Sequence, residues 1–98
     1  MLYLVEMDVA IPHGIDPQAL AKIKQDEKEM GVRLQKEGRW RHLWRVAGRY
    51  ANVSVFDVEN HDELHDLLSQ LPFFPFLTIR VTPLVKHPSA ISRKGTDS

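Results

Sequence analysis

A glutamate stands where the helical pattern of the sequence predicts an apolar side chain. The apolar members of this pattern, spaced by three or four positions, are Leu20, Ile23, Met30 and Leu34. Glu27 fills the missing central position on the same helix face. One possibility is that Glu27 extends to the helix edge or pairs with a basic group of the sheet. The other is that it stays among apolar groups, where burial raises a carboxyl pKa and strengthens the carboxylate as a base. Glu27 is therefore a candidate general base.

His42 is a second candidate for acid–base chemistry, because it lies between Trp40 and Trp44 at the spacing of one strand face. We expect this face to meet the helices. His42 is then either a hydrogen-bonded core histidine or a partner of Glu27. The two tryptophans are expected to be core residues and walls of a cleft.

Basic residues are concentrated around the same positions. Segment 33–49 holds six basic residues and one acid, whereas segment 57–66 holds five acids and no lysine or arginine. These segments are either solvated faces that pair within or between subunits, or they include a local anion site. Arg41 and Arg45 project together, and guanidinium groups suit a two-point grip on a carboxylate.

A metal site is not predicted. His61 and His65 are four residues apart, but the sequence HDELH lacks the glutamate that the zinc-protease motif requires directly after its first histidine. No third ligand is evident. The sequence also has no glycine-rich phosphate loop, nucleophile elbow or cysteine, so the motifs that most cofactor-dependent and covalent mechanisms require are missing.

Length and composition favour one small domain. The chain has 98 residues, with 13 lysines and arginines balanced by 13 aspartates and glutamates. No global charge therefore favours nucleic acid or an anionic membrane. The absence of cysteine fits a reducing compartment, and no apolar run approaches the roughly 20 residues of a membrane span. We expect a cytoplasmic protein that binds neither nucleic acid nor membrane and that gains from self-association.

The elements that must position the candidate side chains follow from periodicity. Period-two alternation predicts a strand over 3–11. Asp16 as N-cap and Pro17 as the first helical residue begin a helix that we expect to end at Glu37, before Gly38.

A hairpin of two strands over 40–47 and 50–58 should follow, with Gly48-Arg49 as a type II′ turn. The cross-strand pairs are then Trp44 with Val53 and His42 with Val55. This register places His42 and Trp44 on one face. The other face carries Arg41, Arg45, Tyr50, Asn52 and Ser54.

The remaining elements complete a βαββαβ order. A capping box at Asn60 begins a second helix that ends by Pro72, and a fourth strand follows over 76–81. We expect an α+β, ferredoxin-like domain over residues 1–86, with a four-stranded antiparallel sheet and both helices on one face. The polar tail 87–98 is either frayed or laid on a neighbour. The uncovered sheet face, expected to carry Leu4, Phe56 and Val58, should pack on another subunit.

Long segments of the chain closely resemble muconolactone Δ-isomerase. The matching strings are DEKE (26–29), LQKEG (34–38), WRHLWR (40–45), AG (47–48), YAN (50–52), SVFDV (54–58), LHD (64–66), QLP (70–72), FP (74–75) and HPS (87–89). They span nearly the whole chain without shifts in spacing. Phe73 and Phe76 depart from the Leu-Phe-Pro-Tyr form of the family.

The resemblance implies a bacterial, cofactor-free isomerase of the catechol branch of the β-ketoadipate pathway, which converts muconolactone to 3-oxoadipate enol-lactone. It also implies ferredoxin-like subunits in a large ring-like homo-oligomer, a decamer. The reaction removes a proton from the ring carbon that bears the carboxymethyl group and returns one to the carbon beside the lactone carbonyl. The intermediate is a dienolate, so donors at the lactone oxygen and a cation for the free carboxylate are needed.

The residues of the sequence supply candidates for each of these roles. The predicted catalytic residues are Glu27 and His42, and the predicted substrate-binding residues are Lys24, Trp40, Arg41, Trp44, Arg45, Tyr50 and Asn52. Glu27 would move the proton, His42, Tyr50 or Asn52 would donate to the enolate, and Arg41, Lys24 or Arg45 would hold the carboxylate. The predicted register puts Arg41, Tyr50 and Asn52 on the face opposite His42, so one subset is wrong unless the site straddles a strand edge or a subunit boundary.

Two other functions use the same features. A chloromuconolactone dehalogenase needs the same cleft but expels chloride instead of reprotonating the ring. A non-catalytic ferredoxin-like module that binds a small anion would not need a carboxylate in the helix stripe.

Overall fold

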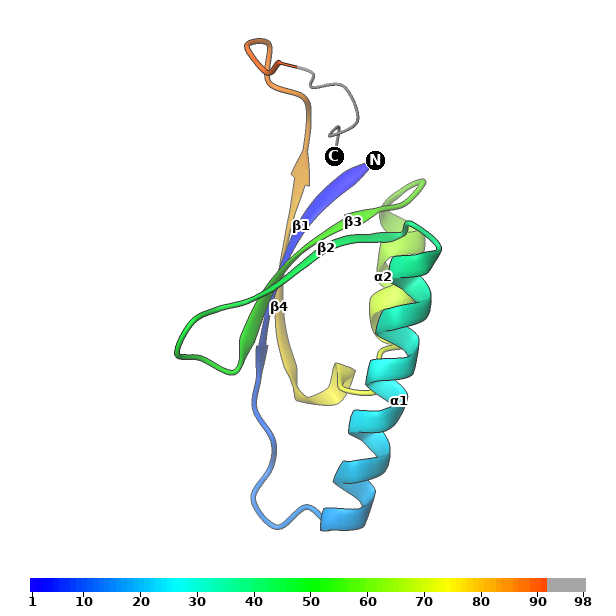
Figure 1. Cartoon of the computed structure of the whole chain (residues 1–98), viewed down its shortest axis with the longest axis vertical. Helices are drawn as coiled ribbons and strands as arrows, with labels where there is room; N and C mark the ends of the chain where they lie inside the picture. The colour runs from blue at the N-terminus through cyan, green and yellow to red at the C-terminus, as the bar shows by residue number, and fades with distance from the viewer. Residues whose placement is uncertain (92–98) are drawn as a thin grey trace.

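One antiparallel sheet with two helices on the same side makes up the fold (Figure 1). The computed structural model describes residues 1–91. Its elements are β1 (Leu2–Val9), α1 (Pro17–Lys36), β2 (Trp40–Arg45), β3 (Ala51–Asp57), α2 (His61–Ser69), the 3₁₀ turn η1 (Phe74–Phe76) and β4 (Leu77–Leu84). The strand order is β2-β3-β1-β4, and every neighbouring pair is antiparallel. The predicted ferredoxin-like βαββαβ architecture is confirmed.

Side-chain caps define where both helices begin. The Asp16 carboxylate accepts a hydrogen bond from the Ala19 N–H at 3.0 Å, and α1 begins at Pro17 as predicted. At α2, Asn60 accepts from the Glu63 N–H at 2.9 Å, and the Glu63 carboxylate accepts from the Glu59 N–H at 2.9 Å. The Asn60 bond is the N-cap that the sequence predicts, whereas the Glu63 bond differs from that of a capping box, because it engages the N–H of Glu59, one residue before the N-cap.

The hydrophobic core lies between the helices and one face of the sheet. Its buried members are Tyr3, Val5, Met7, Leu34, Trp40, Phe56, Val58, Leu64, Leu67, Leu68 and Leu71. The prediction that Phe56 and Val58 lie on the uncovered face is wrong. Phe56 pairs with Tyr3 across β3 and β1, and both side chains point toward the helices. Leu4 does lie on the uncovered face, because successive strand residues alternate sides.

A β-bulge in β2 changes which face its residues occupy. The predicted pairs of Trp44 with Val53 and His42 with Val55 are confirmed, but the register shifts between Trp40 and His42 and pairs Trp40 with Phe56. Because the bulge inserts one extra residue, Trp40 points to the helices while His42 and Trp44 point to the uncovered face. The predicted helix-facing placement of His42 and Trp44 is therefore wrong.

The turn between β2 and β3 also differs from the prediction. The Arg49 N–H donates to the Val46 carbonyl at 3.2 Å, so the turn is centred on Ala47 and Gly48. Gly48 takes a φ of +80° as the second central residue, whereas a type II′ turn needs its glycine in the first. The register nevertheless holds, because the Val46 N–H donates to the Ala51 carbonyl at 3.0 Å.

Strand ends deviate by a few residues from the predicted ranges. β1 ends at Val9, because the Ala10 N–H turns to the Phe76 carbonyl at 2.9 Å. β4 extends to Leu84, beyond the predicted 76–81. The chain beyond it leads away from the sheet (Figure 1), and Val85 and Ile91 are 94% and 76% exposed. Residues 92–98 of the predicted tail lie outside the described residues.

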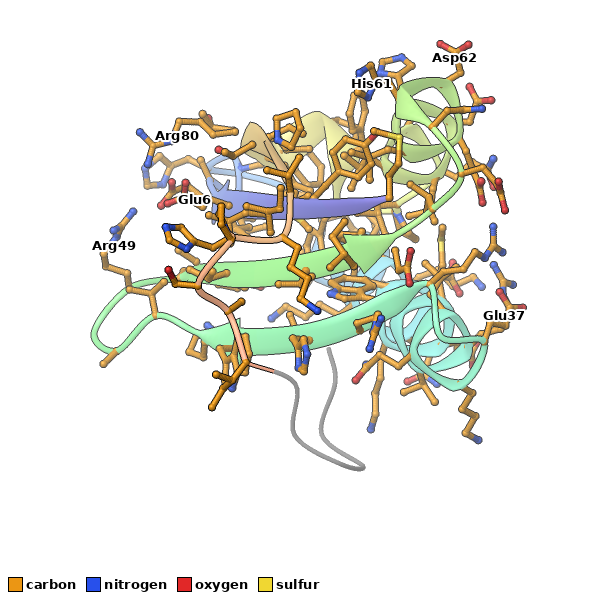
Figure 2. All side chains as sticks on the ribbon, turned by 90° about the horizontal axis from the view of Figure 1, so that it is seen from above. Glu6, Glu37, Arg49, His61, Asp62 and Arg80 are labelled. Carbon is orange, nitrogen blue, oxygen red and sulfur yellow. The ribbon has the colours of Figure 1, made fainter. Side chains whose placement is uncertain are left out.

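Charged residues pair across the uncovered side of the sheet. Arg80 donates to Glu6 at 3.1 Å, and Figure 2 shows these two side chains next to each other, at the opposite side of the molecule from Glu37. Arg49 pairs with Asp8 nearby. No helix within residues 1–91 has the length and apolar character that a membrane span needs.

Candidate active site

A cavity of about 420 Å³ opens between α1, the β2–β3 hairpin and the segment that leads into β4. Its apolar wall is made by Met7, Val9, Gly31, Trp40, Phe73 and Leu77. Its polar residues are Glu27, Lys28, Gln35, Arg45, Tyr50 and Asn52. A largely apolar cavity with a few convergent polar groups is the usual form of a small-molecule site.

Glu27 is the acid of this cavity. Its side chain is half-buried, and its Oε1 accepts a hydrogen bond from the Phe73 main-chain N–H at 3.0 Å. Burial raises the pKa of Glu27 above its ordinary value, and the weaker, opposing effect of the Phe73 hydrogen bond lowers it. Glu27 forms no ion pair within residues 1–91. Of the two readings of the helix pattern, the structure supports the carboxylate among apolar groups.

The raised pKa of Glu27 predicts a pH-dependent cost to folding. Glu27 binds its proton more tightly in the folded protein than in the unfolded chain. This contributes stability that is fully present below the pKa of Glu27 in the unfolded chain and is lost as the pH rises through its pKa in the folded protein. Glu27→Gln removes the ionisation and keeps an acceptor for the Phe73 N–H. We expect this variant to be more stable than the wild type at about pH 8 and not at about pH 4, each unit of pKa difference being worth about 1.4 kcal/mol.

Urea unfolding at both pH values measures this difference. Glu29→Gln is the matched control, because Glu29 lies two residues away on the exposed side of α1. A Glu27→Gln gain that is the same at both pH values, or that the control also shows, would contradict the assignment of the raised pKa to Glu27.

Arg45 is the arginine that the segment 33–49 contributes to the cavity. Its guanidinium lies 5.1 Å from the centre of the Tyr50 ring. Each of the segment's other arginines pairs with an acid, for example Arg39 with Glu37 at 2.7 Å and Arg41 with Asp57 at 3.2 Å. Arg45 has no ion pair within residues 1–91, so the arginines of this segment are four paired surface charges and one cation at the cavity.

Asn52 offers the cavity a hydrogen-bond donor. The Ser54 hydroxyl, which is fully buried, donates to the Asn52 side-chain oxygen at 2.8 Å. This bond occupies the amide oxygen and leaves the amide NH₂ to donate elsewhere. Tyr50, which is 44% exposed, also lines the cavity and carries a hydroxyl group.

The cavity brings together five of the nine predicted site residues. These are Glu27, Trp40, Arg45, Tyr50 and Asn52. The other four do not line it. Lys24 is exposed on α1 and Arg41 pairs with Asp57, while His42 and Trp44 stack on each other at 5.0 Å on the uncovered face.

Three of the cavity residues that the sequence prediction missed matter for its charge, its space or its hydrogen bonds. Lys28 directly follows Glu27 in the sequence and adds a positive charge to the lining. Gly31 lies one helical turn after Glu27, and this spacing places it on the same face. Phe73 contributes a main-chain N–H, which no pattern of side chains reveals.

The two histidines of α2 have other partners. The Nδ1 of His61 and the Tyr3 hydroxyl are hydrogen-bonded at 2.5 Å, and the Nε2 of His65 lies 3.4 Å from the Ser69 hydroxyl. Within residues 1–91, no three His, Asp or Glu side chains gather as metal ligands would.

Comparisons with known proteins agree on one family. A family model described as muconolactone delta-isomerase matches residues 1–90. Muconolactone Delta-isomerase 2 of Acinetobacter lwoffii is 56% identical over 91 residues, which are 93% of this chain and 95% of that relative. For the muconolactone Delta-isomerase of Cupriavidus pinatubonensis the identity is 57% over 91 residues, 93% of this chain and 99% of the relative. A crystal structure of muconolactone isomerase, 54% identical, matches with a TM-score of 0.89 over 95% of this chain and 97% of that one.

Proposed function

The chain belongs to the muconolactone Δ-isomerase family, and from this premise we propose that it converts muconolactone to 3-oxoadipate enol-lactone. The setting is the cytoplasmic breakdown of catechol through the β-ketoadipate pathway. The observation that carries the proposal is the half-buried Glu27 carboxylate, with its raised pKa, in a cavity that is also lined by the positively charged Arg45 and the hydrogen-bond donor Asn52.

Glu27 acts as the proton carrier in this proposal. Its carboxylate takes the proton from the ring carbon that bears the carboxymethyl group, and the electron pair of that C–H bond moves through the ring double bond to the lactone carbonyl oxygen. Glu27 then returns the proton to the carbon beside the carbonyl, and the electron pair of the dienolate forms the new C–H bond. One group whose pKa lies nearer neutrality than that of an ordinary carboxyl serves both steps.

Asn52 and Tyr50 stabilise the dienolate in this proposal. Negative charge develops on the lactone oxygen, and a donor that already points to that place costs no reorganisation during the reaction. Ser54 supports the role of Asn52, because its hydrogen bond to the amide oxygen turns the NH₂ group away from Ser54. Trp40 forms the wall beside the base, and its ring lies against Gly31 of α1.

Arg45 binds the free carboxylate of the substrate in this proposal. Its position at the cavity favours it over Lys24 and Arg41, which do not line the cavity, and Arg41 in addition pairs with Asp57. Lys28 adds a second positive charge to the cavity lining. We leave His42 and Trp44 out of the site, because they lie on the other face of the sheet.

Turnover assays with two substrates test the proposed function. Ultraviolet absorbance follows the loss of muconolactone when enol-lactone hydrolysis is coupled to it. We expect steady turnover of muconolactone by the purified protein. Turnover confined to chlorinated muconolactone, with release of chloride, would point instead to the dehalogenase, and binding without turnover of either lactone would point to an anion-binding module.

Gly31 is expected to keep room for the substrate. A Cβ at this position would meet only Trp40, at an ordinary contact distance of 3.6 Å, so alanine fits and its methyl group takes space in the cavity. We expect Gly31→Ala to raise the free energy of unfolding by up to about 1 kcal/mol, through helix propensity. We also expect kcat/KM for muconolactone to fall roughly tenfold. Steady-state kinetics and urea unfolding measure the two effects, and an unchanged kcat/KM would show that substrate does not use this space.

We further propose that the chain functions as a homo-oligomer, a decamer, in which residues 1–86 form the catalytic domain and the tail 87–98 packs on a neighbouring subunit. The uncovered sheet face supports this, because it carries Leu4, Val55 and the 56% exposed Trp44, and such faces usually pack on a partner. Light scattering of the purified protein tests it, and a monomer at micromolar concentration would contradict it.

A further inference from the structure

A turn between α2 and η1 supplies the hydrogen bond that Glu27 accepts. The Phe73 side chain is 7% exposed and packs edge-on against Phe76, with ring centres 6.3 Å apart. The Phe74 N–H donates to the Leu71 carbonyl at 2.8 Å, and the Phe76 N–H donates to the Phe73 carbonyl at 2.7 Å. The Phe73 N–H is therefore held in place from both sides, in a largely water-shielded position.

We propose that Phe73 is a positioning residue for the isomerisation: its main-chain N–H fixes Oε1 of Glu27 and leaves Oε2 as the oxygen that takes and returns the proton. The proposal rests on the proposed function. Within residues 1–91, Oε1 has this donor at 3.0 Å and Oε2 has none. The two oxygens of the carboxylate are therefore not equivalent.

The geometry of the proposed reaction explains why one fixed oxygen is useful. The proton leaves one ring carbon and is returned to another, so the atom that carries it must reach both. A carboxylate bonded at Oε1 can pivot about that contact, which moves Oε2 over a short arc without loss of orientation. Holding the base in a reactive orientation is a large part of what a catalytic site contributes.

The same hydrogen bond balances the effect of burial on the base. Burial alone favours the neutral carboxylic acid, which cannot accept a proton, whereas the Phe73 N–H favours the ionised form. The pKa of Glu27 is the net result of these two opposed effects. Phe73 therefore controls both the direction of the carboxylate and the pH range in which it is ionised.

A backbone ester tests this role without changing a side chain. Phe73→phenyllactic acid replaces the main-chain N–H by an oxygen and keeps the benzyl group. We expect kcat/KM for muconolactone to fall roughly 10- to 100-fold, because the carboxylate is no longer oriented. We also expect the acidic limb of the kcat/KM profile to move to higher pH, because the opposing effect on the Glu27 pKa is removed.

Phe74→phenyllactic acid is the matched control. This variant places the same amide-to-ester replacement one residue later in the chain. It removes the N–H that donates to the Leu71 carbonyl, so it weakens the same turn but keeps the hydrogen bond to Glu27. We expect its acidic limb to stay at the wild-type pH. An unmoved limb in the Phe73 ester, or an equal shift in both esters, would overturn the positioning role.

A measurement that needs no turnover separates this proposal from the proposed function. The ¹³C resonance of the Glu27 carboxyl, followed against pH, should titrate at higher pH in the Phe73 ester than in the wild type. A titration unchanged by the ester would overturn the role of Phe73 even in an active isomerase. A wild-type protein that does not turn over muconolactone would instead overturn the proposed function.

Discussion

Glu27→Gln should fold and should lose roughly 100-fold or more of its turnover of muconolactone, because the amide cannot accept the proton. The substitution keeps the size of the side chain and an acceptor for the Phe73 N–H, so the cavity keeps its shape. Initial rates at saturating substrate, with circular dichroism as a check of folding, measure the loss.

Glu29→Gln is the control for this loss. Glu29 is exposed on the same helix, where it accepts a hydrogen bond from Gln25 at 2.9 Å, and it does not line the cavity. We expect wild-type turnover from this variant. Near-normal turnover by a folded Glu27→Gln protein would mean that another group moves the proton.

Arg45→Gln should raise KM for muconolactone roughly 10- to 100-fold, with a smaller change in kcat. A hydrogen bond to a charged group contributes about 1.5–3 kcal/mol, and this binding is present before and during the reaction. Arg45→Lys keeps the charge but not the planar two-point donor, so we expect it to recover part of the affinity. Steady-state kinetics of the two variants measure both effects.

Arg41→Gln is the comparison that decides between the two arginines. Arg41 lies four residues away on the same strand and pairs with Asp57 instead of lining the cavity. We expect its KM to stay within about twofold of the wild type, as is usual for a surface ion pair. A KM that rises in Arg41→Gln and not in Arg45→Gln would place the carboxylate on the other side of the strand.

Much of the fold could be predicted from the sequence, because helix caps and strand alternation are local patterns that do not depend on tertiary contacts. The N-caps at Asp16 and Asn60 formed as predicted, since each depends on a side chain and an N–H three residues away. The alternation of β1 identified its buried face in the same way. These features needed no knowledge of what packs against them.

The face of β2 was not predictable from alternation alone. A strict period of two joins Trp40 with His42 and Trp44, and only a bulge separates them. Trp40 stacks on Phe56 at 4.8 Å, a contact with the neighbouring strand that the β2 sequence does not encode locally. The bulge explains why Arg45 belongs to the cavity and His42 does not.

The candidate base could be predicted from the sequence, because the unusual position of its side chain is visible within a single helix. Glu27 interrupts an apolar stripe on its own helix, so no partner had to be known. Its hydrogen-bond donor was missed, because Phe73 is 46 residues away and acts through its main chain. Sequence patterns thus reveal a misplaced side chain more readily than the backbone that holds it.

The most direct test of Glu27 as the proton carrier compares two titrations of the wild-type protein. One is the ¹³C titration of the Glu27 carboxyl, and the other is the acidic limb of the kcat/KM profile for muconolactone. We expect the two to coincide, at a pH above the ordinary glutamate pKa of about 4.3, because burial raises the pKa of Glu27. A Glu27 carboxyl that titrates in the ordinary range, with the kinetic limb at a different pH, would contradict its assignment as the base.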